Sequence, residues 1–226
     1  MVVDGYLYAL GLALLAVLAA YLGGPAWAIP ECLLAAFVLY FFRDPERVPP
    51  PGEWVVSPGD GRVVDLSEIE MDGQKVWKIG IFLNLFDVHV NRSPIAGIIR
   101  KVHYTPGKFL IASRSAASDQ NEQNTVTIEG ACYTVTFKQI AGLLARRIVF
   151  TKKVGDRVQC GERVGLIKFG SRVDIFLPLA LRPMVAMGDR VKGGSTVVAS
   201  LQDQPAQSPQ ASLEADFKTT GSPLRT

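Results

Sequence analysis

The chain has 226 residues, with 24 Lys and Arg against 21 Asp and Glu, and a formal net charge of +3. This length suits one sizeable globular domain with an appendage, and the near balance of charges gives no indication of a nucleic-acid partner. The three cysteines, Cys32, Cys132 and Cys160, are odd in number and far apart in the chain. They indicate neither a disulfide framework nor a zinc site and suit a reduced, cytosol-facing domain.

Residues 1–44 are predicted to be a membrane anchor. Two apolar segments, about 6–22 and 26–42, flank a Gly-Gly-Pro turn, and each is near the lower limit of about 17 residues for a membrane-crossing helix. We expect a transmembrane helical hairpin; one span followed by an interfacial helix is the alternative. No basic segment precedes the first run, which disfavours a cleaved signal peptide.

The charges that follow the anchor set its orientation. Arg43 and Arg47 come directly after the second apolar segment, so the positive-inside rule places the rest of the chain on the cytoplasmic face of the cell membrane. A proline-rich linker then leads into a domain that we expect to span residues 45–202. Residues 203–226 are rich in Gln, Ser, Pro and Thr and are predicted to be a disordered tail.

The domain has the pattern of a mainly β fold. Short runs of alternating branched residues are separated by Gly and Pro, and only 108–118 and 138–149 have the composition of short helices. The segment Val154-Gly-Asp-Arg-Val-Gln-Cys-Gly is echoed by Met187-Gly-Asp-Arg-Val-Lys-Gly-Gly. The same turn spacing occurs in the barrel-sandwich domains that carry biotin or lipoate. Two copies predict a related, lipoyl-like β-sandwich in which each half uses this turn.

Three places in the domain are candidates for chemistry. Asp87, His89 and Asn91 alternate with apolar residues, so on a strand they share one face; a solvated edge strand is the alternative. Asp60 lies between two glycines, where an Asp can also simply form the turn. His103, the second histidine, is expected to be structural.

The third candidate is Gly170-Ser171, set between two apolar runs. A serine hydroxyl can attack the carbonyl that precedes it, and glycine is the least obstructive residue there. The resulting ester can eliminate to dehydroalanine, which hydrolyses to a pyruvoyl group and ammonia. A base must activate the serine, and a histidine oriented by a carboxylate is a common solution.

From residue 41 to about residue 201 the sequence resembles the phosphatidylserine decarboxylase family in its short bacterial and archaeal form. Six motifs occur in family order, and together they are highly specific: Phe41-Phe-Arg-Asp-Pro-Glu-Arg, Ser57-Pro-Gly-Asp-Gly, Phe86-Asp-Val-His-Val-Asn-Arg, Tyr104-Thr-Pro-Gly-Lys-Phe, Asn121-Glu-Gln-Asn and Phe169-Gly-Ser-Arg-Val-Asp.

The resemblance implies self-cleavage between Gly170 and Ser171 into a β chain and an α chain, the latter beginning with a covalent pyruvoyl cofactor. It implies that Asp60 and His89 lie near the cleavage point. Longer members have a second histidine three residues after the one matching His89, and it is credited with driving cleavage; here that position is Arg92. We therefore expect His89 to serve both cleavage and catalysis, assistance by another group being the alternative.

The implied reaction begins when the amine of phosphatidylserine forms a Schiff base with the pyruvoyl ketone. Carbon dioxide then leaves, His89 protonates the carbanion, and phosphatidylethanolamine is released. For the headgroup of this membrane phospholipid we expect Asn91, Arg92 and Lys108 as binding residues, and no metal is required. Arg114, Arg146 and Arg147 are further cations that could meet the headgroup, with solvated surface charge as the alternative.

Two other functions stay open at this point. One is a pyruvoyl decarboxylase of another amino-lipid, and the other is a non-catalytic, membrane-tethered β-sandwich that binds a partner. The sequence also allows a homo-oligomer.

Overall fold

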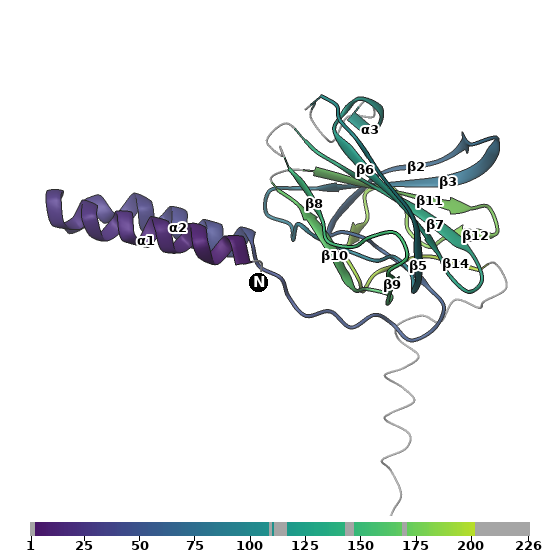
Figure 1. The fold of residues 1–226 in the computed structure, drawn as a ribbon, viewed down its shortest axis with the longest axis horizontal. Helices are drawn as coiled ribbons and strands as arrows, with labels where there is room; N and C mark the ends of the chain where they lie inside the picture. The colour runs from purple at the N-terminus through teal and green to yellow at the C-terminus, as the bar shows by residue number, and fades with distance from the viewer. Residues whose placement is uncertain (1–2, 109, 111–116, 143–146, 169–170, 202–226) are drawn as a thin grey trace, which may run out of the picture.

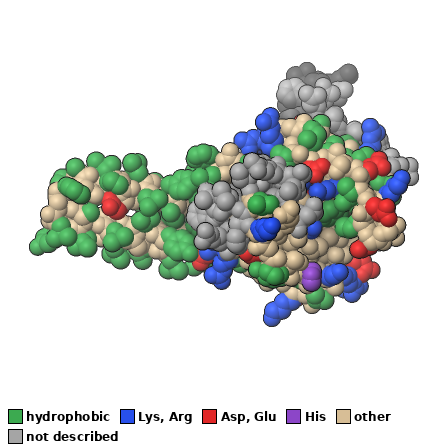
Figure 2. All heavy atoms as spheres, turned by 90° about the horizontal axis from the view of Figure 1, so that it is seen from above, with side chains coloured by type: hydrophobic (Ala, Val, Ile, Leu, Met, Phe, Trp, Pro, Cys, Tyr) green, Lys and Arg blue, Asp and Glu red, His purple; other side chains and the backbone are tan. Residues whose placement is uncertain are grey.

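A computed structural model describes residues 3–108, 110, 117–142, 147–168 and 171–201. A helical hairpin projects from a β domain (Figure 1). It consists of α1 (Val3–Gly23), the 3-10 helix η1 (Pro25–Ala28) and α2 (Ile29–Phe41). Figure 2 shows that hydrophobic side chains cover the hairpin, whereas charged side chains gather on the β domain.

Helix α1 is apolar and long enough to cross a membrane. Its 21 residues span about 31 Å, close to the hydrocarbon thickness of about 30 Å. The second apolar stretch, Pro25–Phe41, is shorter. Both helices meet the β domain at the same end of the hairpin, because Asp4 Oδ2 lies 2.7 Å from Lys168 Nζ and the rings of Tyr8 and Phe42 are 5.8 Å apart.

The domain is mainly β, as the sequence predicts, and its largest sheet curls around the core (Figure 1). That sheet has the strand order β13-β2-β3-β11-β7-β6-β5-β9, and two three-stranded sheets, β4-β10-β8 and β1-β14-β12, complete the domain. The bounds are β1 (Val55–Val56), β2 (Gly61–Met71), β3 (Gln74–Leu83), β4 (Val90–Arg92), β5 (Gly97–Thr105), α3 (Ala117–Gln120), β6 (Gln123–Glu129), β7 (Thr134–Ile140), β8 (Ile148–Phe150), β9 (Arg157–Val158), β10 (Arg163–Ile167), β11 (Ser171–Pro178), β12 (Leu181–Pro183), β13 (Arg190–Val191) and β14 (Val197–Leu201).

The expected helix at 138–149 is wrong where the structure describes it. Residues 138–140 end β7 and residues 148–149 begin β8. Burial in β7 has a period of two, with Val135 and Phe137 fully buried, and this places alternate residues against the core. Of the other expected helix, 108–118, the described part includes the start of α3 at Ala117.

The repeated Gly-Asp-Arg-Val segments occupy equivalent places in the two halves of the domain. Gly155 N donates to Ile99 O at 2.8 Å, and Gly188 N donates to Val63 O at 2.9 Å. Both glycines have positive φ angles, 95° and 92°, which favour a residue without Cβ. Each turn leads into a short strand, β9 or β13, and these two strands form the opposite edges of the eight-stranded sheet. The internal echo therefore reflects a repeated structural unit.

Candidate active site

Ser171 is the first residue of β11, which lies between β3 and β7 in the middle of the large sheet. Its antiparallel partner on β3 is Leu83, and both residues are completely buried. Directly paired residues of a ladder point to the same face, so the Ser171 side chain faces the core with Leu83. Gly170, the predicted partner in cleavage, lies outside the described residues.

The buried hydroxyl of Ser171 lacks a described hydrogen-bond partner. Its Oγ has no hydrogen-bond partner among the residues that the structure describes. An unsatisfied buried hydroxyl costs about 1–3 kcal/mol, and a native fold rarely keeps one without a reason. Ser171 is therefore a buried polar group whose position calls for an explanation other than packing.

The opposite face of β11 carries a buried charge network that the sequence analysis missed. Arg172 Nε donates to Asp174 Oδ1 at 2.5 Å, and Arg172 Nη2 donates to Asp65 Oδ2 at 2.9 Å. Lys78 Nζ lies 3.2 Å from Asp65, and Ser118 Oγ donates to Asp174 at 2.5 Å. Burial opposes the charge of Arg172, but the two carboxylates outweigh it and raise the pKa of the guanidinium. These bonds fasten the backbone immediately after Ser171.

His89 lies just before β4 and is 2% exposed, so the alternative of a surface histidine is wrong. Its Nδ1 is 3.0 Å from the carbonyl oxygen of Asp87. Since a carbonyl only accepts, Nδ1 carries the proton and Nε2 is the basic nitrogen. Burial lowers the pKa of His89 to about 4, against the opposing effect of Asp87. The imidazole is therefore neutral at pH 7 and able to accept a proton.

Backbone pairing places His89 beside the end of β10, four residues before Ser171 in the chain. Ile167 N, at the end of β10, donates to His89 O at 3.2 Å. Four residue steps separate Ile167 from Ser171. Since an extended chain spans at most about 3.6 Å per residue, the Cα atoms of Ile167 and Ser171 lie within about 14 Å of each other.

Asp60 lies at the entrance to β2 and is largely buried. Its Oδ2 is 2.9 Å from Arg47 Nη2, and its Oδ1 accepts a hydrogen bond from Gly193 N at 2.8 Å. Burial raises the pKa of Asp60, with Gly193 N and Arg47 acting in the opposite direction. Asp60 and Val88, the neighbour of His89, line the same pocket of about 570 Å³. The described contacts of His89 orient it through Asp87 O rather than through Asp60.

A second turn in the chain shows that the turn at Asp60 does not require a carboxylate. Ser93-Pro-Ile-Ala-Gly, which leads into β5, is equivalent to Ser57-Pro-Gly-Asp-Gly, which leads into β2. Ser57 Oγ donates to Gly59 O at 2.6 Å, and Ser93 Oγ donates to Ile95 O at 2.7 Å in the equivalent turn. The residue that follows the second turn is Ala96, at the position equivalent to Asp60. The carboxylate is thus present in one half only, where it contacts Arg47 and Gly193 N.

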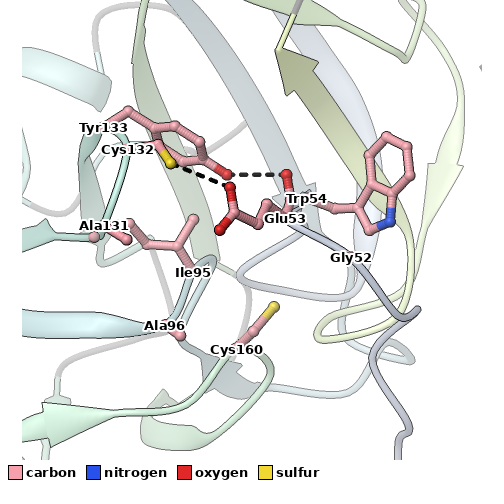
Figure 3. A pocket seen from close by; sticks show the side chains of 10 residues that line it. Gly52, Glu53, Trp54, Ile95, Ala96, Ala131, Cys132, Tyr133 and Cys160 are labelled. Carbon is pink, nitrogen blue, oxygen red and sulfur yellow. Dashed lines mark hydrogen bonds between the residues drawn. The ribbon is translucent and has the colours of Figure 1, made fainter. Parts of the chain in front are cut away.

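Ala96 lines a separate pocket of about 120 Å³ (Figure 3). There, Cys132 Sγ donates to Glu53 Oε2 at 3.1 Å, and burial raises the pKa of Cys160 to about 11. None of the predicted site residues lines this pocket.

Asn91 is completely buried and lies in β4. Its Oδ1 accepts a hydrogen bond from Gln139 Nε2 at 2.9 Å, and Gln139 Oε1 accepts one from Asn124 Nδ2 at 3.0 Å. Asn91 Nδ2 has no acceptor among the described residues. A Cβ added to Gly59 would lie 3.4 Å from this Nδ2 and 3.5 Å from a methyl of Leu83, the strand partner of Ser171. The free amide therefore lies in the same corner of the core as Ser171.

Arg92 is 4% exposed and faces the linker that joins the hairpin to the domain. Its Nη1 donates to Gly161 O at 3.0 Å, and its Nη2 donates to Asp44 Oδ1 at 3.1 Å and to Pro45 O at 2.9 Å. Burial lowers the pKa of Arg92.

The remaining predicted cations and His103 are less closely tied to this corner. Lys108 is exposed, and its Nζ lies 3.4 Å from Gln120 Oε1. Arg147 is exposed, and Arg114 and Arg146 lie outside the described residues. His103 is exposed on β5. His89 and Asp60 thus both contact residues near the foot of the hairpin, and Asn91 and Ser171 both lie close to Leu83.

The family model and the related proteins that match this chain all carry the same family name. Residues 34–199 match the family model described as phosphatidylserine decarboxylase. A phosphatidylserine decarboxylase proenzyme of Solibacter usitatus is 54% identical over 200 residues, which cover 88% of this chain and 96% of the relative. Proteins of the same name from Polynucleobacter asymbioticus and Cupriavidus pinatubonensis are 46% and 42% identical, covering 80% and 88% of this chain and 86% and 94% of the relatives.

Proposed function

The chain belongs to the phosphatidylserine decarboxylase family and is a decarboxylase proenzyme, and we propose that it matures by cleaving its own Gly170-Ser171 bond. Maturation would convert Ser171 into the pyruvoyl group used to turn phosphatidylserine into phosphatidylethanolamine and CO2. The observation that carries the proposal is the buried Oγ of Ser171 at the head of a central strand, which has no hydrogen-bond partner among the described residues.

In the cleavage step, Ser171 Oγ attacks the carbonyl carbon of Gly170, and His89 Nε2 accepts the hydroxyl proton. As the peptide bond rearranges to an ester, this proton passes to the Ser171 nitrogen. A base, for which neutral His89 is the candidate, then takes the Cα proton of Ser171, and the Cβ–Oγ bond breaks so that Gly170 leaves as a carboxylate. Hydrolysis of the resulting dehydroalanine releases ammonia. The neutral state of His89 suits this role, although its low pKa makes it a weak base.

Asn91 is assigned a donor role at the same corner. Its Nδ2, which has no acceptor among the described residues, would donate a hydrogen bond to the oxygen on which negative charge develops, while Gln139 holds the amide by its Oδ1. A preorganised donor of this kind stabilises developing charge strongly. In the mature enzyme the pyruvoyl group supplies the electron sink for decarboxylation; His89 holds the proton that replaces CO2, and Asn91 binds the substrate.

The two chains produced by cleavage would remain associated. Strand β11, at the start of the α chain, pairs with both β3 and β7 of the β chain. Strands β13 and β14 pair with β2 and β1. These four backbone ladders therefore replace the lost peptide bond as the link between the chains. Assembly into a homo-oligomer stays a prediction.

The position of the hairpin supports a site at a membrane surface, and the charges of Arg43 and Arg47 after α2 are the basis for proposing its cytoplasmic face. Acyl chains cost about 0.8 kcal/mol per CH2 to expose to water, so an enzyme that lifts only the headgroup avoids that cost. The pocket beside Asp60 is lined by Arg43, Arg47 and Lys192, which suit the phosphate and carboxylate of the headgroup. Under this proposal both helices enter the bilayer and the β domain lies against the headgroups.

Intact-mass analysis of the purified full chain tests the proposal. We expect two chains, the smaller one starting with a carbonyl in place of the Ser171 amine, and release of CO2 from phosphatidylserine. Ser171→Ala should give one uncleaved chain without activity. Ser195→Ala, at another Gly-Ser dipeptide, is the matched control and should cleave normally.

Two outcomes would refute the assignment: cleavage that persists in Ser171→Ala, or an active wild-type protein that is one unbroken chain. Parallel assays with other amino-lipids and with free serine separate phosphatidylserine from the alternative substrates.

A further inference from the structure

One short segment contacts both residues that the family resemblance marks as catalytic. We call residues 41–47, from the last residue of helix α2 to the start of the proline-rich linker, the membrane-proximal arm. At its start, the Phe41 ring lies 4.4 Å from the His89 ring, measured between centroids, at an interplanar angle of 37°. At its end, Arg47 Nη2 lies 2.9 Å from Asp60 Oδ2. The arm therefore links helix α2 directly to His89 and Asp60.

The arm is fixed to the β domain along its length. Asp44 pairs with Arg92 at 3.1 Å and with Arg163 at 2.6 Å. Arg43 Nη2 donates to Phe86 O at 2.7 Å. Phe41 and Phe42 are 1% and 2% exposed and pack with Leu166 of β10. These side chains are buried in protein rather than facing lipid, so attachment to the membrane does not explain them.

The arm also sets the electrostatic surroundings of the two residues. Phe41 shields the imidazole from water, and the charged groups that face His89 are Asp87 and Arg43. Arg47 opposes the effect of burial on Asp60 and so favours its ionised form. An undocked arm would hydrate His89 and leave Asp60 without its cationic partner.

We propose that the membrane-proximal arm is a positioning element of the active site, in which Phe41 seats the His89 imidazole and Arg47 holds the Asp60 carboxylate. Docking of the anchor then assembles the site as well as recruiting the protein to the bilayer. This inference rests on the proposed function, because it assigns the two residues their catalytic environment.

The test uses the full chain in detergent with a short-chain phosphatidylserine that is soluble as a monomer, so that recruitment to a bilayer is not required. Phe41→Leu keeps an apolar side chain and removes the ring, and Phe41→Tyr keeps the ring. Arg47→Met and Arg47→Lys form the second pair. Leu33→Ala, at an exposed position on α2, is the matched control for anchor changes.

We expect Phe41→Leu to lower kcat about tenfold or more, with KM changed less than about twofold, as for a group that acts on the transition state. The acid limb of its pH profile should move up by about one pH unit, toward the ordinary value of a hydrated histidine. Phe41→Tyr should retain most of the activity. Arg47→Met should lower kcat and Arg47→Lys should restore part of it, while Leu33→Ala stays at the wild-type rate.

The inference is overturned if folded Phe41→Leu and Arg47→Met keep the wild-type kcat and pH profile. Should Phe41→Leu fail to fold, the Arg47 pair decides, because that contact lies outside the apolar core. A wild-type protein without the carbonyl or the activity refutes the proposed function instead, so the two failures are distinguishable.

Discussion

Arg92 Nη2 lies 3.1 Å from Asp44 Oδ1 and joins a β4 residue to the segment that leaves the membrane anchor. Longer family members have a histidine at the position of Arg92. In this chain the side chain at that position binds Asp44, Pro45 and Gly161 instead of pointing to a described catalytic group. Its geometry is that of a clamp between linker and domain.

We expect Arg92→Met to lower the free energy of unfolding by about 3 kcal/mol, because it leaves two carbonyls without this donor and the largely buried Asp44 carboxylate with Arg163 as its remaining ion-pair partner. Urea denaturation in the uncleaved Ser171→Ala background measures the change. Arg100→Met, which breaks the exposed ion pair with Glu129, should leave the midpoint near that of the parent. Equal effects of the two substitutions would contradict the clamp.

The charge network behind Ser171 makes a second prediction. Asp174→Asn removes the carboxylate that binds the Arg172 guanidinium and Ser118, and leaves a buried cation with one partner fewer. We expect a loss of about 3 kcal/mol in stability and slower self-cleavage, since β11 starts at the reacting residue. Mass spectrometry over time after expression follows the uncleaved fraction. Cleavage at the wild-type rate in Asp174→Asn would show that the network does not hold the reacting geometry.

The burial of His89 predicts a pH dependence of stability. Its pKa is about 4 in the folded protein, against an ordinary value of 6.5. Between these values the unfolded state binds a proton that the folded state does not. The free energy of unfolding therefore falls as the pH drops from 6.5 to about 4, by up to about 3 kcal/mol, and this contribution is constant above that window.

The comparison is between His89→Gln and its parent, both in the Ser171→Ala background. Chemical denaturation at intervals from pH 7 to pH 4 should show a shallower fall in stability for His89→Gln. Parallel curves for the two proteins would mean that His89 is hydrated in the fold.

The hydrogen-bonded side-chain amides of Asn91, Gln139 and Asn124 predict that a substitution at Gln139 affects self-cleavage at Ser171. Gln139→Leu removes the donor to Asn91 Oδ1 and leaves Asn124 without its acceptor. We expect self-cleavage to slow about tenfold or more, because Asn91 loses the contact that aims its Nδ2. Thr127→Val, which removes the hydroxyl pair with Thr136 elsewhere on the same sheet, is the control. A Gln139→Leu protein that cleaves as fast as this control would exclude Asn91 as an oriented donor.

Much of the site was accessible from the sequence because its residues carry local signals. The alternation around His89 predicted a strand face shared by Asp87, His89 and Asn91; strand β4 begins only at Val90, so of the three only Asn91 lies on a strand, but His89 and Asn91 are both buried. The duplicated Gly-Asp-Arg-Val turn predicted two related halves, and its backbone hydrogen bonds repeat in both. A turn repeats in sequence because positive φ at Gly155 and Gly188 demands glycine.

The features that the sequence did not predict depend on contacts between residues far apart in the chain. Segment 138–149 was expected to be helical because its composition allows a helix, but tertiary contacts against the core selected two strands. The network of Arg172 with Asp65 joins residues 107 positions apart. No local sequence pattern predicts a contact between residues so far apart.

By itself, the sequence determined the apolar N-terminal segments, the mainly β pattern and the family, and it singled out Ser171, His89 and Asp60 as candidate site residues. These features depend on residue type and short spacing, which are written along the chain. Only the tertiary structure decided that Ser171 Oγ is buried without a described partner, that Phe41 packs on His89 and that Arg47 binds Asp60. Burial and the pairing of distant charges exist only once the chain has folded, because both depend on what water no longer reaches.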